Sequence, residues 1–188
     1  MAEVVSSEIE ICNQALLLLG AVTINDFTES SDMARLCSNL YAPSRNAVLR
    51  LHPWNFAVTR VQLAPEAAAP AFGFGYSFVI PPDCERILEV SEDTYKIERR
   101  KILCDSSVLN LKYIFRNTAV TEYDSLFIDA LAAYLAFKMA YPITKSNETK
   151  KVMFDTFKSI FPMAKNIDGQ EEPQDTFGDF PFIDARSK

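Results

Sequence analysis

The chain has 188 residues, of which 48% are hydrophobic and 23% are charged. This composition excludes a chain that is disordered throughout, and the length suits one domain, or one domain with an appendage. The formal net charge of −6 argues against a free-standing DNA- or RNA-binding protein, because a basic surface supplies most of the affinity for nucleic acid.

Two helices are predicted before Pro53. The first covers about 7–19, with Ser6 or Ser7 as its N-cap and Gly20 after its end. The second covers about 32–52, and Pro43 is expected to kink it. Its N-cap candidates are Ser30, Ser31 and Asp32, its expected apolar face is Met33, Leu36, Leu40, Ala47, Val48 and Leu51, and its other face carries Arg35, Arg45 and Arg50.

The pattern between residues 56 and 116 changes to short β-type runs separated by glycine and proline. These runs predict a small antiparallel sheet inserted between helices. The expected strands are 56–63, 76–80, 86–90, 95–98, 101–104 and 109–115.

Helices are predicted again after residue 120. Residues 126–141 are almost continuously apolar, which is typical of a helix at the centre of a bundle, and Pro142 is expected to end it. This stretch is too short for a bilayer span and carries two charges, so we expect no membrane segment. A fourth helix is predicted from Ser146 to about residue 167, with Pro162 inside it.

The expected fold class is therefore α+β, mainly an α-helical bundle of about four helices with an inserted small antiparallel β-sheet. Residues 1–55 and 117–167 form the bundle, 56–116 the β-rich subdomain, and 168–188 an extended C-terminal arm. The arm combines acidic residues with apolar ones, whereas a solvated terminus is poor in aromatics. Two interpretations stay open: the arm docks on another molecule, or it folds back over its own core.

No constellation of residues predicts a catalytic, cofactor or metal site. The four cysteines are scattered and the chain has one histidine, so zinc ligands at short spacing are lacking. A thiolate–imidazole pair of Cys84 and His52 is disfavoured, because Asp83 and Glu85 flank the thiol. Gly73 and its neighbours lack the third glycine of a dinucleotide-binding loop.

A basic cluster is expected at a hairpin tip. It comprises Glu98, Arg99, Arg100 and Lys101. The cluster is either a solvated turn or a contact for an acidic partner surface.

Six segments, in order, carry a resemblance to a known family. They are HPWNF at 52–56, GYSFVIPPDCERILEV at 75–90, RKILCD at 100–105, LNLKYI at 109–114, FIDALA at 127–132 and AYPIT at 140–144. Together they resemble the tail tubular protein A family of short-tailed bacteriophages, the head-to-tail adaptors. The resemblance extends from about residue 8 to the C-terminus. Phe78 replaces a frequent tyrosine, and Pro162 falls inside the expected last helix.

The resemblance implies a structural virion protein and no enzyme. Such adaptors form a dodecameric ring under the portal protein, present an attachment surface to the tail nozzle, and let genomic DNA pass without specific binding. The resemblance implies no cofactor and no membrane, and it implies that the protein is made in the host bacterial cytoplasm and resides in the virion tail. An acidic or neutral channel wall would not retain the DNA phosphates.

Two contact sites follow as hypotheses. The arm would dock on the portal or on a neighbouring copy through Phe177, Phe180, Phe182, Ile183 and Arg186, and the hairpin tip at 98–101 would face the nozzle. Two alternatives remain: another connector component, such as a stopper or tail-completion protein, or a small cytosolic enzyme. A pocket converging on Cys84 or His52 would favour the enzyme.

Overall fold

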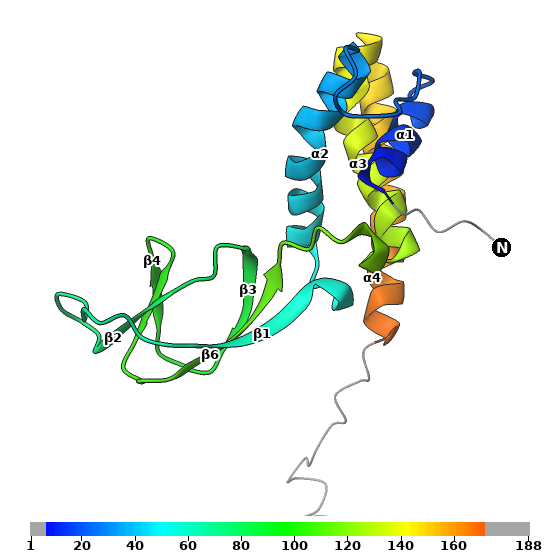
Figure 1. The fold of residues 1–188 in the computed structure, drawn as a ribbon. Coiled ribbons are helices and arrows are strands. Elements are labelled where there is room, and N and C mark those ends of the chain that lie inside the picture. The colour runs from blue at the N-terminus through cyan, green and yellow to red at the C-terminus, as the bar shows by residue number, and fades with distance from the viewer. Residues whose placement is uncertain (1–6, 172–188) are drawn as a thin grey trace, which may run out of the picture.

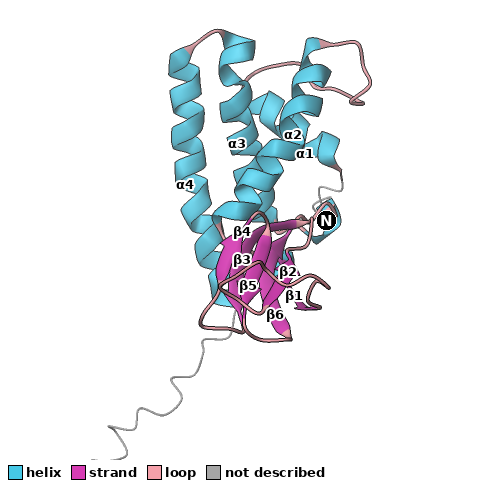
Figure 2. Ribbon diagram, turned by 90° about the vertical axis from the view of Figure 1, so that its left-hand side faces the viewer, coloured by secondary structure: helices cyan, strands magenta, loops and turns pink. Residues whose placement is uncertain are grey.

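The computed structural model describes residues 7–171 and shows an α+β fold. Within this range four α-helices stand side by side, and two small antiparallel sheets project from one end of the bundle (Figures 1 and 2). The helices are α1 (Glu8–Leu18), α2 (Asp32–Leu51), α3 (Ser125–Thr144) and α4 (Asn147–Glu171). The predicted fold class is confirmed, although two sheets replace the single one expected.

Local signals set the helix starts as predicted. The Ser7 hydroxyl accepts a hydrogen bond from the Glu10 amide at 3.2 Å, and the Ser7 amide donates to the Glu10 carboxylate at 3.0 Å, which is a complete capping box. At the start of α2 the Ser31 hydroxyl accepts a hydrogen bond from the Ala34 amide at 3.1 Å. After α1, Gly20 has a φ of 66°, a left-handed conformation that glycine adopts without strain.

Helix α3 is the core of the bundle, as its apolar sequence predicts. It packs against α1, α2 and α4, and its buried residues are Phe127, Ile128, Ala130, Leu131, Ala132, Ala133, Leu135, Ala136, Met139 and Ala140. Among the described residues it is the one helix long and apolar enough to cross a membrane by length and composition. Packing against three helices accounts for that composition.

The prediction that Pro142 ends α3 is wrong, because the helix continues to Thr144. The final turn does not depend on the missing proline amide. The Thr144 hydroxyl donates to the Ala140 carbonyl at 2.7 Å, and the amide of Lys145, with a φ of 55°, donates to Tyr141 at 2.9 Å. A proline near the C-terminal end therefore costs the helix little.

The predicted faces of α2 are confirmed in part. Met33, Leu36 and Leu40 pack against the core of the bundle and Val48 is fully buried, whereas Leu51 is 49% exposed. Arg35 and Arg50 are exposed as predicted. Arg45, assigned to the outer face, is buried: its guanidinium lies 3.3 Å from the Glu8 carboxylate and donates to the Asn46 side chain at 3.1 Å. A charge with such partners can be buried, so the apolar pattern alone misplaces Arg45.

The β-rich part contains two three-stranded sheets that share a second core. Their orders are β1-β6-β3 and β2-β5-β4. The strands are β1 (Val58–Leu63), β2 (Tyr76–Val79), β3 (Cys84–Val90), β4 (Lys96–Glu98), β5 (Lys101–Cys104) and β6 (Leu109–Phe115). Residues 55–57, expected in part as strand, form a 3-10 turn. The core between the sheets contains Phe78, Ile80, Cys84, Ile102, Cys104, Leu109, Leu111 and Tyr113.

One buried hydroxyl in the bundle yields a stability prediction. Tyr41 is 3% exposed, and its hydroxyl has no hydrogen-bond partner among residues 7–171; burial raises its pKa. Tyr41→Phe should leave the free energy of unfolding unchanged or raise it by about 1 kcal/mol, measured by urea denaturation. The matched variant Tyr123→Phe should lose about 1 kcal/mol, because that hydroxyl donates to the Asn117 carbonyl at 2.7 Å. Equal losses for both variants would contradict the prediction.

Candidate functional site

The predicted hairpin tip is confirmed as a structural feature. Glu98 ends β4, Lys101 begins β5, and the two arginines between them form the turn. Arg99 and Arg100 have φ values of 48° and 60°. Positive φ at both central residues is the pattern of a type I′ turn, which usually carries asparagine or glycine. Two arginines in this conformation are therefore strained, and strain of this kind gathers at functional sites.

Two of the four tip residues are engaged within the chain. The Arg100 guanidinium donates to the Pro81 carbonyl at 2.9 Å. Lys101 lies 2.8 Å from the Glu66 carboxylate and holds the pKa of that carboxyl below its usual value. The side chains of Glu98 and Arg99 have no polar partner among residues 7–171, so these two side chains are available for a contact with another molecule.

Replacing Arg99 measures how much the left-handed backbone conformation at this position lowers the stability of the protein. Arg99→Asn should raise the free energy of unfolding by about 0.5–1 kcal/mol, because asparagine tolerates the left-handed region better than arginine does. The control Lys96→Asn, in the exposed strand before the turn, should be neutral or destabilising, since asparagine disfavours strands. Chemical denaturation measures both. A loss at Arg99 as large as that at Lys96 would show that the turn is not strained.

A surface depression of about 370 Å³ lies where α2 meets the sheets. Three arginines line it: Arg50 from α2, Arg86 from β3 and Arg100 from the hairpin turn. Its apolar lining is Ile80, Cys84, Ile87 and Ile97. We call this feature the arginine depression.

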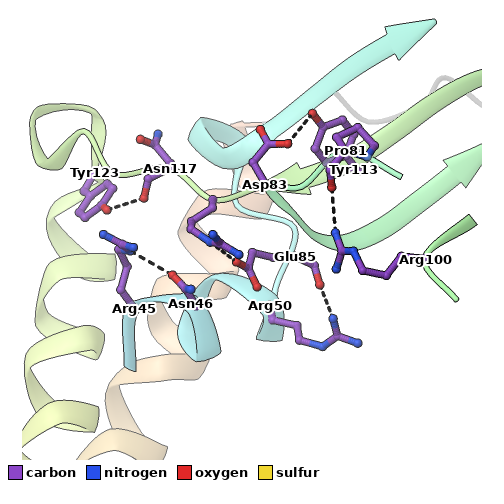
Figure 3. A network of polar contacts seen from close by, with 11 residues as sticks. Arg45, Asn46, Arg50, Pro81, Asp83, Glu85, Arg100, Tyr113, Asn117 and Tyr123 are labelled. Carbon is purple, nitrogen blue, oxygen red and sulfur yellow. Dashed lines mark hydrogen bonds and ion pairs between the residues drawn. The ribbon is translucent and has the colours of Figure 1, made fainter. Parts of the chain in front are cut away.

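Each arginine of the depression binds a backbone carbonyl. Arg50 donates to the Glu85 carbonyl and Arg100 to the Pro81 carbonyl (Figure 3). Arg86 donates to the Arg50 carbonyl at 3.1 Å. The Glu85 carboxylate, which also lines the depression, instead accepts from Arg116 at 2.6 Å. Among the residues that the structure describes, therefore, three positive charges gather here and no carboxylate is bound directly to their guanidinium groups.

The enzyme alternative required a pocket at Cys84 or His52, and Cys84 does line this depression. Burial raises the pKa of the Cys84 thiol, which favours the neutral, unreactive form. His52 is engaged elsewhere, with its Nε2 atom 3.0 Å from the Asp168 carboxylate. The geometry suits binding of an anion better than catalysis by a thiolate.

The end of α4 is fastened to the segment between α2 and β1. One Asp168 carboxylate oxygen contacts His52, the other accepts from the Asn55 amide at 3.0 Å, and the Asp168 carbonyl accepts from the Asn55 side chain at 2.7 Å. Residues 168–171 are therefore the last turn of α4, which corrects the expectation that the extended arm begins at 168.

Sequence reasoning did not find this contact, although one signal was present. Asp168 continues the helical spacing of the buried residues Met153, Phe157 and Ala164, so its side chain falls on the buried face of α4. A carboxylate at such a position requires a polar partner. His52 and Asn55, between two elements, can supply it.

Large apolar side chains are exposed on two separate parts of the molecule. On α1 and α4 they are Leu17, Leu18, Val152, Met163 and Ile167, and in the β-rich part they include Phe72, Val79 and Ile97. A further depression of about 420 Å³ between α1, α3 and α4 is lined partly by Leu17, Leu18 and Ile160. Exposed apolar patches are typical of protein–protein contacts.

The predicted docking residues Phe177, Phe180, Phe182, Ile183 and Arg186 lie outside the described residues. Within residues 7–171 no group of three or more histidine, cysteine or acidic side chains is placed to hold a metal ion. Neither the protein-family models nor the curated proteins compared with this chain include a match.

Proposed function

We propose that this chain is a structural protein of a bacteriophage virion, a head-to-tail adaptor that forms a ring between the portal and the tail nozzle. The ordered resemblance of six sequence segments supports the proposal. The structural observation that carries it is the presence of exposed apolar side chains on both the bundle and the β-rich part. A chain with several such surfaces is suited to binding several protein neighbours.

Ring formation supplies a physical reason for more than one surface. A cyclic ring joins each copy to the next through two different patches, one on each side of the subunit. The apolar residues of α1 and α4 are candidates for one of these patches. Portal and nozzle then require further contacts, which we assign to the C-terminal residues 177–186 and to the hairpin tip at 98–101.

The structure reduces the number of hairpin residues that we assign to the nozzle contact. Lys101 pairs with Glu66 and Arg100 binds Pro81. The nozzle contact is therefore assigned chiefly to Arg99 and Glu98, which have no polar partner among residues 7–171. DNA would pass through the ring without specific binding, and no catalytic step is part of this function.

Light scattering of the full chain, alone and mixed with the portal ring from the same genome, tests the proposal. The portal peak should gain the mass of about twelve copies of the 21.2 kDa chain. Phe180→Ser with Phe182→Ser should abolish this gain, whereas the control Phe72→Ser, at a side chain 89% exposed, should leave it intact. A portal peak of unchanged mass with the unaltered chain would refute the adaptor role.

A further inference from the structure

We propose that the arginine depression is a docking site for an acidic, aromatic peptide, and that residues 172–188 of the same chain occupy it in the free protein. The inference goes beyond the proposed function, because it concerns the isolated chain and holds whatever partner the chain has. It also chooses between the two interpretations of the arm that the sequence leaves open.

The charge of the depression supports an acidic ligand. A guanidinium group has five N–H donors, and Arg50, Arg86 and Arg100 each make one hydrogen bond among the described residues. Among residues 7–171 none of these three arginines forms an ion pair with a carboxylate, and the nearby acids have other partners: Glu85 is bound to Arg116 at 2.6 Å and Asp83 to Tyr113 at 3.4 Å. Carboxylates are the ligands that match arginine donors in pairs.

The apolar lining adds a second requirement. Ile97 is 51% exposed, and Ile80 and Cys84 lie beneath the same depression. A simple inorganic anion would leave Ile97 in water, whereas a peptide can cover it with an aromatic side chain. The ligand that fits both features carries acidic and apolar side chains in alternation.

Residues 172–188 have this composition. The acidic residues are Glu172, Asp175, Asp179 and Asp184, and the apolar ones between or beside them are Phe177, Phe180, Phe182 and Ile183. Duplex DNA has the charge but no apolar side chains, and a depression of about 370 Å³ is too small to receive it. The chain's net charge of −6 also disfavours DNA.

The point at which the segment leaves the structure favours the same chain as its source. Helix α4 ends at Glu171, one turn after Asp168, and Asp168 is bound to His52 and Asn55. His52 follows Arg50 by two residues, so the segment starts at the same end of the bundle as the depression. Seventeen residues, counted from 172 to 188, can extend over about 56 Å at 3.3 Å each. A tethered segment also binds at a high effective concentration.

Docking of this kind would shield the same phenylalanines that we assign to the portal or neighbour contact. One set of side chains cannot fill two sites at once. A partner would therefore have to displace the segment from the depression. Until then, the free chain would keep these phenylalanines covered.

Photo-crosslinking of the full-length protein tests this inference. p-Benzoylphenylalanine replaces Phe180, the sample is irradiated at low concentration, and the cross-linked peptides are mapped by mass spectrometry. The expected product has the mass of one chain and joins residue 180 to peptides that contain Ile80, Ile87 or Ile97. Raising the salt concentration should lower its yield, because the contact is ionic.

Variants on both sides of the contact sharpen the test. Arg50→Gln with Arg100→Gln should lower the yield about fivefold, and Asp179→Asn with Asp184→Asn should do the same while leaving residues 7–171 unchanged. Combining all four changes should lower the cross-link yield little further, because the two arginines and the two aspartates would contribute to the same contact. Arg35→Gln, at an exposed arginine paired with Asp32 on the same helix, is the matched control and should leave the yield unchanged.

Three results would overturn the inference. A cross-link to the depression found in a product with the mass of two chains would assign the site to a second copy. A cross-link to α1 and α4 instead would assign the segment to the depression between those helices. Binding of a duplex oligonucleotide that Arg50→Gln with Arg100→Gln abolishes, measured by fluorescence anisotropy, would assign the arginines to nucleic acid.

Discussion

Replacing Trp54 with alanine should lower the free energy of unfolding by about 4 kcal/mol. The side chain is fully buried, and its indole nitrogen donates to the Val48 carbonyl at 3.1 Å. Its ring meets Phe127 edge to face with centroids 5.0 Å apart, and His52 with centroids 4.8 Å apart. The substitution removes these contacts together and opens a cavity where α2, α3 and α4 meet the sheets.

Thermal and urea unfolding, followed by far-UV circular dichroism, measures this loss. Fluorescence is unsuitable, because Trp54 is the only tryptophan of the chain. Trp54→Phe should lose less, about 2 kcal/mol, since a ring remains but the hydrogen bond to Val48 is gone. Phe72→Ala, at an exposed ring, should change stability by less than about 0.5 kcal/mol. A Trp54→Ala loss no larger than that of Phe72→Ala would contradict the packing described for this residue.

Removing the Asp168 carboxylate should cost about 3 kcal/mol, because Asp168→Ala leaves partly buried polar groups of His52 and Asn55 without their partner. Asp168 is 5% exposed and the His52 side chain is 14% exposed, so water replaces the lost contacts poorly. The last turn of α4 should also open. Hydrogen–deuterium exchange at residues 165–171 should therefore rise more than exchange at residues 150–157.

Two comparisons isolate the role of this contact. Asp155→Ala removes an exposed carboxylate on the same helix, 3.6 Å from Lys158, and should cost less than about 0.5 kcal/mol. Asp168→Asn should fall between the two, because an amide oxygen can still accept from the Asn55 amide. Equal losses for Asp168→Ala and Asp155→Ala would show that the end of α4 is not fastened as described.

The sequence predicts well what depends on neighbours along the chain. Ser7, Ser31 and Gly20 act within one helical turn of their own positions, and all three fulfil the predicted roles. Ser146 likewise accepts from the Thr149 amide at 3.1 Å at the start of α4. Such signals need no knowledge of the rest of the fold.

Features set by distant partners could not be predicted in the same way. Arg45 is buried because Glu8, 37 residues earlier, is near it, and no periodicity reveals that pair. The contact between Asp168 and Asn55 joins residues 113 positions apart. The arginine depression takes its charges from three elements, so it becomes visible only when α2, β3 and the hairpin turn are placed in space.

The two stretches of chain that join the β-rich part to the bundle belong to neighbouring strands. The chain leaves the helices at the start of β1 and returns at the end of β6, and Val58 is paired with Ile114 across these two strands. Because Ile114 also belongs to the core of the bundle, the two connections are fixed side by side. Because β3 also contacts α2, the insertions that could lengthen the distal hairpins without moving a helix are those in the loops outside β3, at residues 67–75 or 91–95. Related chains could thus diverge in the surface they offer to a neighbour while preserving the same helical frame.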